Sequence, residues 1–270
     1  MLDNMIWLGD SECGRSIFAA ARQFDEVIFP KLDLRENLDD YGSNPVGYEK
    51  AGDVAIIKVK GGTLKSPSFM TRWLQIPTYE DIADRLDSAA GDSKIKLILF
   101  LLDSSGGQAS GVKKLAEKIR EIGKPIISFT EEIQMSAAMW YGSACTQCVA
   151  DPDAELGSIG VIATVLTYAD AYKKEGIGVN IFRSVPGKQL VNSMEDMSEE
   201  GRKSIQKTVD AFHVSFVKAM SGYRGIDEKL FSENIATGLT FSAKEALQHK
   251  LIDHIMPLNE LVTRLAKFKG

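Results

Sequence analysis

The sequence predicts an α/β protein built from successive strand, helix and strand units. Two strongly apolar segments, Val54–Val59 and Ile95–Leu102, have the composition of strands in a parallel sheet that is covered on both faces. Between them, the segment from Tyr79 to Ala90 carries apolar residues at helical spacing. Strands and helices then continue to alternate, which is the pattern of parallel strands joined by right-handed helical crossovers.

The later elements follow in a regular order. The turn Asp103–Gly107 ends the second strand and leads into a helix expected over Gly111–Ile122. A strand at Pro125–Phe129 and a helix over Ser136–Ala144 come next. The remaining expected elements are strands at Cys148–Ala150, Val161–Ala163 and Val179–Arg183, and helices ending at Lys174, over Ser198–Tyr223 and over Ser242–His249.

The chain of 270 residues is 44% hydrophobic and 26% charged, which is enough to bury the core of one α/β domain. Residues 1–50 lack the regular alternation of the remainder, although Ser16–Ala21 has the composition of a short helix. We therefore expect an N-terminal arm or extension over residues 1–50 and a main domain over residues 51–270.

Charge and hydropathy argue against a nucleic-acid partner and against a membrane anchor. The net charge is −5 and no basic run appears, which argues against a nucleic-acid partner. The beginning of the chain, Met1-Leu2-Asp3-Asn4, has no basic region before an apolar one, and no stretch approaches the ~18 apolar residues of a spanning helix. We expect no membrane anchor and a cytoplasmic location.

Three cysteines, Cys13, Cys145 and Cys148, suit a reducing compartment better than a disulfide framework. Cys145 and Cys148 have the spacing of a zinc-binding pair, but no second pair completes a four-ligand site. Free cysteines of this kind are usually buried. We therefore expect two inert thiols, no metal and no cofactor.

Ser136 is the candidate nucleophile. It lies where a strand gives way to a helix, so its hydroxyl and the amides of the first helical turn share one space. Serine attacks only when a neighbouring base takes its proton, and the three histidines lie in the C-terminal quarter, outside any glycine-rich turn. Lys188, which follows Pro186-Gly187, is the better candidate base. This role requires that burial lowers the pKa of its amine, so that the amine is neutral and can accept a proton. The alternatives are a helix-capping serine and an ordinary surface lysine.

The turn Asp103-Ser104-Ser105-Gly106-Gly107 lies at the carboxyl end of the most apolar strand, where open α/β sheets bind ligands. Two adjacent glycines allow a sharp turn and leave backbone N–H groups unobstructed, as an oxyanion hole requires. The alternative is a plain turn after a strand.

Together these motifs resemble the signal peptide peptidase A family, which includes phage head-maturation proteases. The resemblance extends from about Val54 to Pro257 and rests on motifs in a fixed order. They are Asp-Ser-Ser-Gly-Gly from Asp103, Met-Ser-Ala-Ala-Met-Trp-Tyr from Met135, Gly-Ser-Ile-Gly-Val from Gly157, Arg-Ser-Val-Pro-Gly-Lys ending at Lys188, and a closing segment from Thr240 to Asp253. The resemblance implies a crotonase/Clp-protease-like superhelix of βαβ units and a Ser/Lys dyad without histidine.

By this resemblance Ser136 is the nucleophile and Lys188 the general base, and Ser158 holds the lysine amine in place. The implied oxyanion-hole residues are Gly106, Gly107 and Ala137. Ser105 departs from the family pattern, which usually has proline before the glycine pair.

The resemblance implies an ATP-independent serine endopeptidase, and we expect a phage or prophage prohead protease that trims scaffold and capsid proteins. It would act as a homo-oligomer in the host cytoplasm or the prohead, with neighbouring subunits completing each site. The alternatives are a bacterial cytoplasmic peptidase of the same family, a crotonase-like acyl-CoA enzyme and a non-catalytic shell component. Portal and major capsid genes beside this one would favour the phage role.

Overall fold

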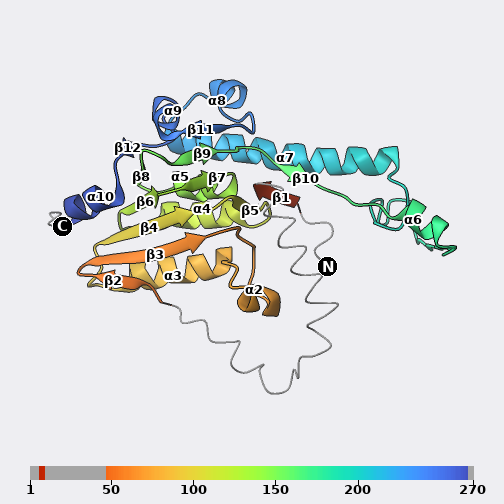
Figure 1. Cartoon of the computed structure of the whole chain (residues 1–270), viewed down its shortest axis with the longest axis horizontal. Coiled ribbons are helices and arrows are strands. Elements are labelled where there is room, and N and C mark those ends of the chain that lie inside the picture. Colours follow the sequence, from red (N-terminus) through yellow and green to blue (C-terminus); the bar gives the residue numbers. More distant parts are fainter. Residues whose placement is uncertain (1–5, 10–46, 267–270) are drawn as a thin grey trace, which may run out of the picture.

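The structure, a computed structural model, describes residues 6–9 and 47–266. Its main body is a six-stranded sheet (Figure 1), in which neighbouring strands are parallel except for the antiparallel pair at the β2 edge. In spatial order the strands are β12 (His254–Ile255), β8 (Gln147–Ala150), β6 (Ile126–Thr130), β4 (Leu97–Asp103), β3 (Val54–Lys60) and β2 (Glu49–Ala51).

Both faces of this sheet are covered, as the apolar strands predict. Ile98 and Phe100 of β4 point into the larger core cluster, and Leu97 and Leu99 belong to the smaller one. The larger core includes α3 (Tyr79–Gly91), α4 (Val112–Glu121) and α5 (Ala137–Ser143), whereas α10 (Leu258–Leu265) packs on the opposite face through Leu261. The predicted α/β alternation of strands and crossover helices is confirmed.

Two small sheets lie at the carboxyl ends of the central strands. One has the order β11-β9-β7, with β7 (Ile133–Met135) parallel to β9 (Glu155–Gly157) and β11 (Thr240–Ser242) antiparallel to β9. The other has the order β10-β1-β5, formed by β10 (Ile162–Ala163), β1 (Ile6–Gly9) and β5 (Gly106–Gln108). Gly106 and Gly107, which the sequence predicts to be part of a turn, begin β5.

The long helix α7 (Glu199–Arg224) has 26 residues and is therefore about 39 Å long. Ser198 caps its first turn, as predicted, by accepting a hydrogen bond from the Gly201 amide at 3.0 Å. Its C-terminal half packs on α5, where the rings of Trp140 and Phe216 stack at 4.7 Å. Its N-terminal half and α6 (Ala169–Lys174) project beyond the sheet (Figure 1).

The shorter helices complete the described part of the chain. They are α2 (Phe69–Trp73), α8 (Glu228–Asn234) and α9 (Ala243–Gln248). The capping box of α9, in which Ser242 and Glu245 satisfy each other's backbone amides, fixes the beginning of this predicted helix.

The strand predicted at Val179–Arg183 is wrong. This segment has no strand partner among the described residues, and Val179 and Phe182 are exposed. Its β-branched and aromatic residues favour an extended chain, but a strand forms only when another strand offers backbone partners. The helix expected at Ser16–Ala21 lies outside the described residues.

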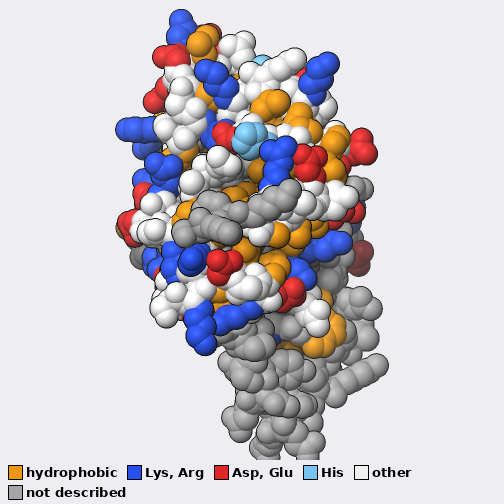
Figure 2. All heavy atoms as spheres, turned by 90° about the vertical axis from the view of Figure 1, so that its left-hand side faces the viewer, with side chains coloured by type: hydrophobic (Ala, Val, Ile, Leu, Met, Phe, Trp, Pro, Cys, Tyr) orange, Lys and Arg blue, Asp and Glu red, His pale blue; other side chains and the backbone are white. Residues whose placement is uncertain are grey.

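Acidic and basic side chains are interspersed on the face that carries α10, seen in Figure 2, with hydrophobic side chains gathered between them. Among the helices of residues 6–9 and 47–266, none is long and apolar enough to cross a membrane.

Candidate active site

Ser136 lies at a sharp turn between β7 and α5. Its backbone has φ 51° and ψ −115°, a left-handed value of φ that is uncommon for any residue other than glycine. Two backbone hydrogen bonds hold the turn: the Ser136 amide donates to the Gly157 carbonyl at 2.8 Å, and the Ser136 carbonyl accepts from the Trp140 amide at 3.1 Å. Backbone strain of this kind costs about 1–3 kcal/mol and clusters at functional sites. A strained strand-to-helix turn is also the usual setting of a serine nucleophile.

The Ser136 side chain does not cap the helix that it precedes. It makes no capping hydrogen bond, and its Oγ lies 3.4 Å from the carbonyl oxygen of Gly160. The capping-serine alternative is therefore excluded. Ser136 is also 0% exposed, so an external substrate reaches its hydroxyl only after whatever covers it has moved.

The loop at the end of β4 lies directly beside this turn. The Ser104 amide donates to the Ile133 carbonyl at 2.9 Å, and the Met135 amide donates to the Ser104 carbonyl at 2.9 Å. These bonds fasten the loop to β7 immediately before Ser136. The structure thus brings Ser136 and the predicted oxyanion loop together.

Within that loop the two glycines have different surroundings. The Gly106 amide donates to Oγ of Ser104 at 3.2 Å, so this N–H is already engaged. A Cβ at Gly107 would lie 2.1 Å from Oγ1 and 2.3 Å from the carbonyl oxygen of Thr63, so any larger residue at this position requires the loop to shift. Gly107 is therefore the better placed of the two predicted donors. Ala137 is the first residue of α5, whose opening amides have no partner inside the helix.

Buried polar groups brace the loop from behind. The Gly106 carbonyl accepts from the Thr63 amide at 2.9 Å and from Thr63 Oγ1 at 3.1 Å. Tyr79 donates its hydroxyl to the Gln108 carbonyl at 2.7 Å. Burial raises the pKa of Tyr141 to about 12, so it is a neutral phenol. Thr63 and Tyr79 do not stand out in the sequence, because their role depends on contacts between distant segments.

Ser158 also lies near the nucleophile. It follows β9, whose last residue, Gly157, pairs with Met135, and it too has a positive φ of 50°. Ser158 and Gly160 line a cavity of about 390 Å³ that α7 closes with Val209 and His213. The structure thus places the predicted Ser158 beside the Ser136 turn.

Lys188 lies elsewhere in the described molecule. It belongs to the segment between α6 and α7, which projects beyond the sheet, and its side chain is exposed (Figure 1). Local bonds shape this segment: the Lys188 amide donates to the Val185 carbonyl at 3.0 Å, and the Lys188 carbonyl accepts from Nε of Arg183 at 2.9 Å. Arg183 is also paired with Glu195. A single copy of the chain therefore does not bring Lys188 to Ser136.

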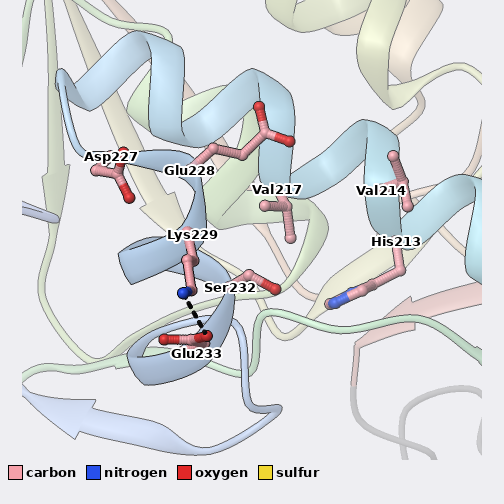
Figure 3. A pocket seen from close by; sticks show the side chains of 8 residues that line it. All are labelled: His213, Val214, Val217, Asp227, Glu228, Lys229, Ser232 and Glu233. Carbon is pink, nitrogen blue, oxygen red and sulfur yellow. Dashed lines mark ion pairs between the residues drawn. The ribbon is translucent and has the colours of Figure 1, made fainter.

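A separate hollow of about 510 Å³ lies between α7 and α8 (Figure 3). His213 points into it, and Lys229 on its wall is paired with Glu233 at 3.9 Å. Val214 and Val217 of α7 line the remaining wall in this view. Ser136 and the glycine loop do not line this hollow, which we do not assign to the chemistry.

The cysteine prediction is confirmed in part. Cys145 and Cys148 are buried free thiols, and burial raises the pKa of both, so neither is a reactive thiolate. Cys13 lies outside the described residues. Within residues 6–9 and 47–266 no cluster of three or more His, Cys, Asp or Glu side chains has the geometry of a metal site.

Comparison with known proteins identifies the family. The model of peptidase family S49 matches residues 118–270, and the chain belongs to this family. One relative is the head-tail preconnector protein GP5 of Enterobacteria phage P21, 25% identical over 261 residues that cover 94% of this chain and 52% of the relative. Another is the capsid assembly protease C of Escherichia phage lambda, 25% identical over 228 residues, 83% of this chain and 51% of the relative. The chain spans about half the length of these curated relatives.

The family also includes cellular relatives. A putative signal peptide peptidase SppA of Enterococcus faecium is 24% identical over 238 residues, 85% of this chain and 69% of the relative. Among solved structures, the ClpP protease catalytic domain of Plasmodium falciparum matches with TM-score 0.48 and 10% identity, covering 75% of this chain and 85% of that one. A ClpP1 mutant of Listeria monocytogenes matches with TM-score 0.49 and 12% identity, covering 76% and 92%.

Proposed function

We propose that this protein is an ATP-independent serine endopeptidase with Ser136 as its nucleophile. The observation that carries the proposal is the Ser136 turn: a strained, buried serine that caps no helix and lies beside a braced glycine loop. Membership of peptidase family S49 supports the same chemistry. The acyl-CoA alternative has no comparable support, because neither the family nor the site points to a thioester substrate.

In the proposed reaction Oγ of Ser136 attacks the carbonyl carbon of a peptide bond while its proton passes to a base. The amides of Gly107 and Ala137 then stabilise the negative oxygen of the tetrahedral intermediate, an interaction that strengthens as charge develops there. The leaving amine takes the proton, and water hydrolyses the ester formed at Ser136.

The base, in this proposal, is Lys188 of a neighbouring copy. The segment that carries Lys188 projects from the domain and exposes apolar side chains, with Phe182 95% exposed. Exposed apolar groups gathered on one segment mark a contact surface, and contact with another copy would also bury the lysine as a neutral base requires. We therefore propose a homo-oligomer in which this segment carries Lys188 to the neighbour's Ser136.

We further propose that the substrates are scaffold and capsid proteins of a phage or prophage and that cleavage takes place in the host cytoplasm or the prohead. Two relatives named for head assembly support this role, one of which matches 94% of the chain. Portal and capsid genes on either side of this one would agree with it, and their absence would favour a cellular peptidase instead.

The direct test is to incubate the protein with scaffold and capsid proteins from the same genome and to read the products by mass spectrometry. We expect defined cleavage products that disappear with Ser136→Ala. Ser158→Ala should lower the rate less, because it removes only a group that would orient the lysine. Undiminished cleavage by Ser136→Ala would refute the proposed nucleophile.

A further inference from the structure

The strand β1 lies between two strands that come from distant parts of the chain. Ile6–Gly9 is the middle strand of the sheet β10-β1-β5 (Figure 1), paired antiparallel on both sides. One neighbour, β5, begins with the glycine pair of the oxyanion loop. The other, β10, follows Gly160, whose carbonyl accepts the hydrogen bond of the Ser136 hydroxyl. The chain thus inserts its own backbone between the two edges that border the nucleophile.

The register places one residue of β1 beside the glycine pair of the oxyanion loop. Gly9 is paired with Gly106 on one side. On the other side Ile6 is paired with Ala163 and Trp7 with Ile162, which lies two residues after Gly160. Gly9 therefore lies level with the first glycine of the oxyanion loop.

The direction of the strand is also informative. The chain runs from Ile6 towards Gly9, so it approaches the nucleophile from the amino-terminal side, as the acyl part of a peptide must in order to form an ester with serine. If β1 were absent, the strands β5 and β10 would border an empty slot. The slot would be about 10 Å wide, which is two strand spacings, and both of its edges would carry unpaired backbone groups. Such a slot accepts any extended peptide through backbone hydrogen bonds.

We infer that Ile6–Gly9 is an internal peptide ligand of the active site, bound where the substrate strand binds, with Gly9 at the position of the residue before the cleaved bond. This inference rests on the proposed function and deepens it. It assigns the substrate class as extended peptides with a small residue at the cleaved position.

The test compares two full-length variants at the same position. Leu8→Pro removes a backbone N–H and adds a ring that a central strand does not accommodate, whereas Leu8→Ala keeps the N–H. The readout is the rate at which a fluorophosphonate probe labels Ser136. We expect Leu8→Pro to raise this rate by about tenfold or more, since the slot opens more often, and Leu8→Ala to change it less than about threefold.

Two controls separate this inference from the proposed function. Labelling that persists in Ser136→Ala would refute the proposed nucleophile. Labelling that depends on Ser136 but is equally fast in Leu8→Pro and the parent protein would overturn only the internal ligand. Hydrogen exchange shows whether Leu8→Pro acts locally: we expect faster exchange at Gly106–Gln108 and Ile162–Ala163 with unchanged protection in β4 and β6. Faster exchange throughout the sheet, without faster labelling, would also overturn it.

A synthetic peptide tests the position directly. Acetyl-Ile-Trp-Leu-Gly should inhibit peptide hydrolysis by the Leu8→Pro variant competitively, raising KM and leaving kcat unchanged. A peptide of the same composition in scrambled order should inhibit more weakly. Absence of inhibition by the first peptide, or inhibition that lowers kcat alone, would contradict binding in the slot.

Discussion

Gly107→Ala tests whether the glycine loop is the oxyanion hole. The added Cβ would lie 2.3 Å from the Thr63 carbonyl oxygen and 2.8 Å from the Tyr79 hydroxyl. The Thr63 carbonyl is fixed by the Gln108 amide at 2.9 Å and cannot rotate away as a side chain does. An ordinary contact of about 3.4 Å therefore requires the loop to shift by about 1 Å, and a shift of that size costs about a hundredfold in rate.

The expected result is a fall in kcat of about 10²–10³, the cost of one lost oxyanion donor, with a smaller change in KM. The assay is steady-state hydrolysis of a peptide substrate, with thermal melting to verify folding. Gly123→Ala is the matched control, because a Cβ there meets no atom within 4 Å. If Gly107→Ala destabilises the fold, Thr63→Ala gives a second reading: it removes the Oγ1 donor to the Gly106 carbonyl and should lower kcat by about tenfold. A folded Gly107→Ala protein with kcat within threefold of the parent would refute the assignment.

Three further predictions concern the dyad, the histidine and the acid stability of the fold. Ser136→Ala and Lys188→Ala should each abolish peptide hydrolysis, and the double variant should be no worse than either, because residues that act as a unit have strongly non-additive effects. His213→Asn should keep most of the activity although His213 lines the cavity beside Gly160; loss of peptide hydrolysis in this variant would make His213 the base instead. Partial burial acts to raise the pKa of Asp253, but the hydrogen bonds from Arg224 and from the Cys148 amide, together with the charge of Arg224, outweigh it, and the pKa lies below its ordinary value. The ion pair therefore stabilises the fold above the unfolded pKa of about 3.9 and is lost as pH falls through the lower folded value. Asp253→Asn should cost about 3 kcal/mol at neutral pH, because it leaves the buried Arg224 unpaired, and should flatten the acid branch of the unfolding curve measured in urea.

The central fold was predictable because its signals are local. The apolar run of β4 indicates a strand covered on both faces, and Ile98 and Leu99 indeed belong to opposite cores. The beginning of α7 is marked by Ser198 and the acids that follow it. By contrast, Val179–Arg183 has strand composition but no partner strand in the described chain, and a single sequence does not encode where a partner would come from.

The site was predictable in part for the same reason. The position of Ser136 at a strand-to-helix turn follows from the local pattern, whereas the hydrogen bond that holds this turn goes to Gly157, which a different strand supplies. The bracing of Gly106 by Thr63 depends on a contact between segments 43 residues apart. The place of β1 could not be predicted either, because its two neighbours come from distant parts of the chain.

The measurement that tests the proposed site most directly is complementation between two inactive proteins. Ser136→Ala and Lys188→Ala are mixed as unfolded chains in equal amounts, refolded together and assayed for peptide hydrolysis. If each site takes its serine from one copy and its lysine from the neighbour, random mixing in a closed ring leaves about a quarter of the sites with both groups intact. We therefore expect the mixture to recover about a quarter of the parent activity and either variant alone to recover none. A mixture that stays as inactive as its components, while the parent protein treated identically recovers, would contradict this expectation.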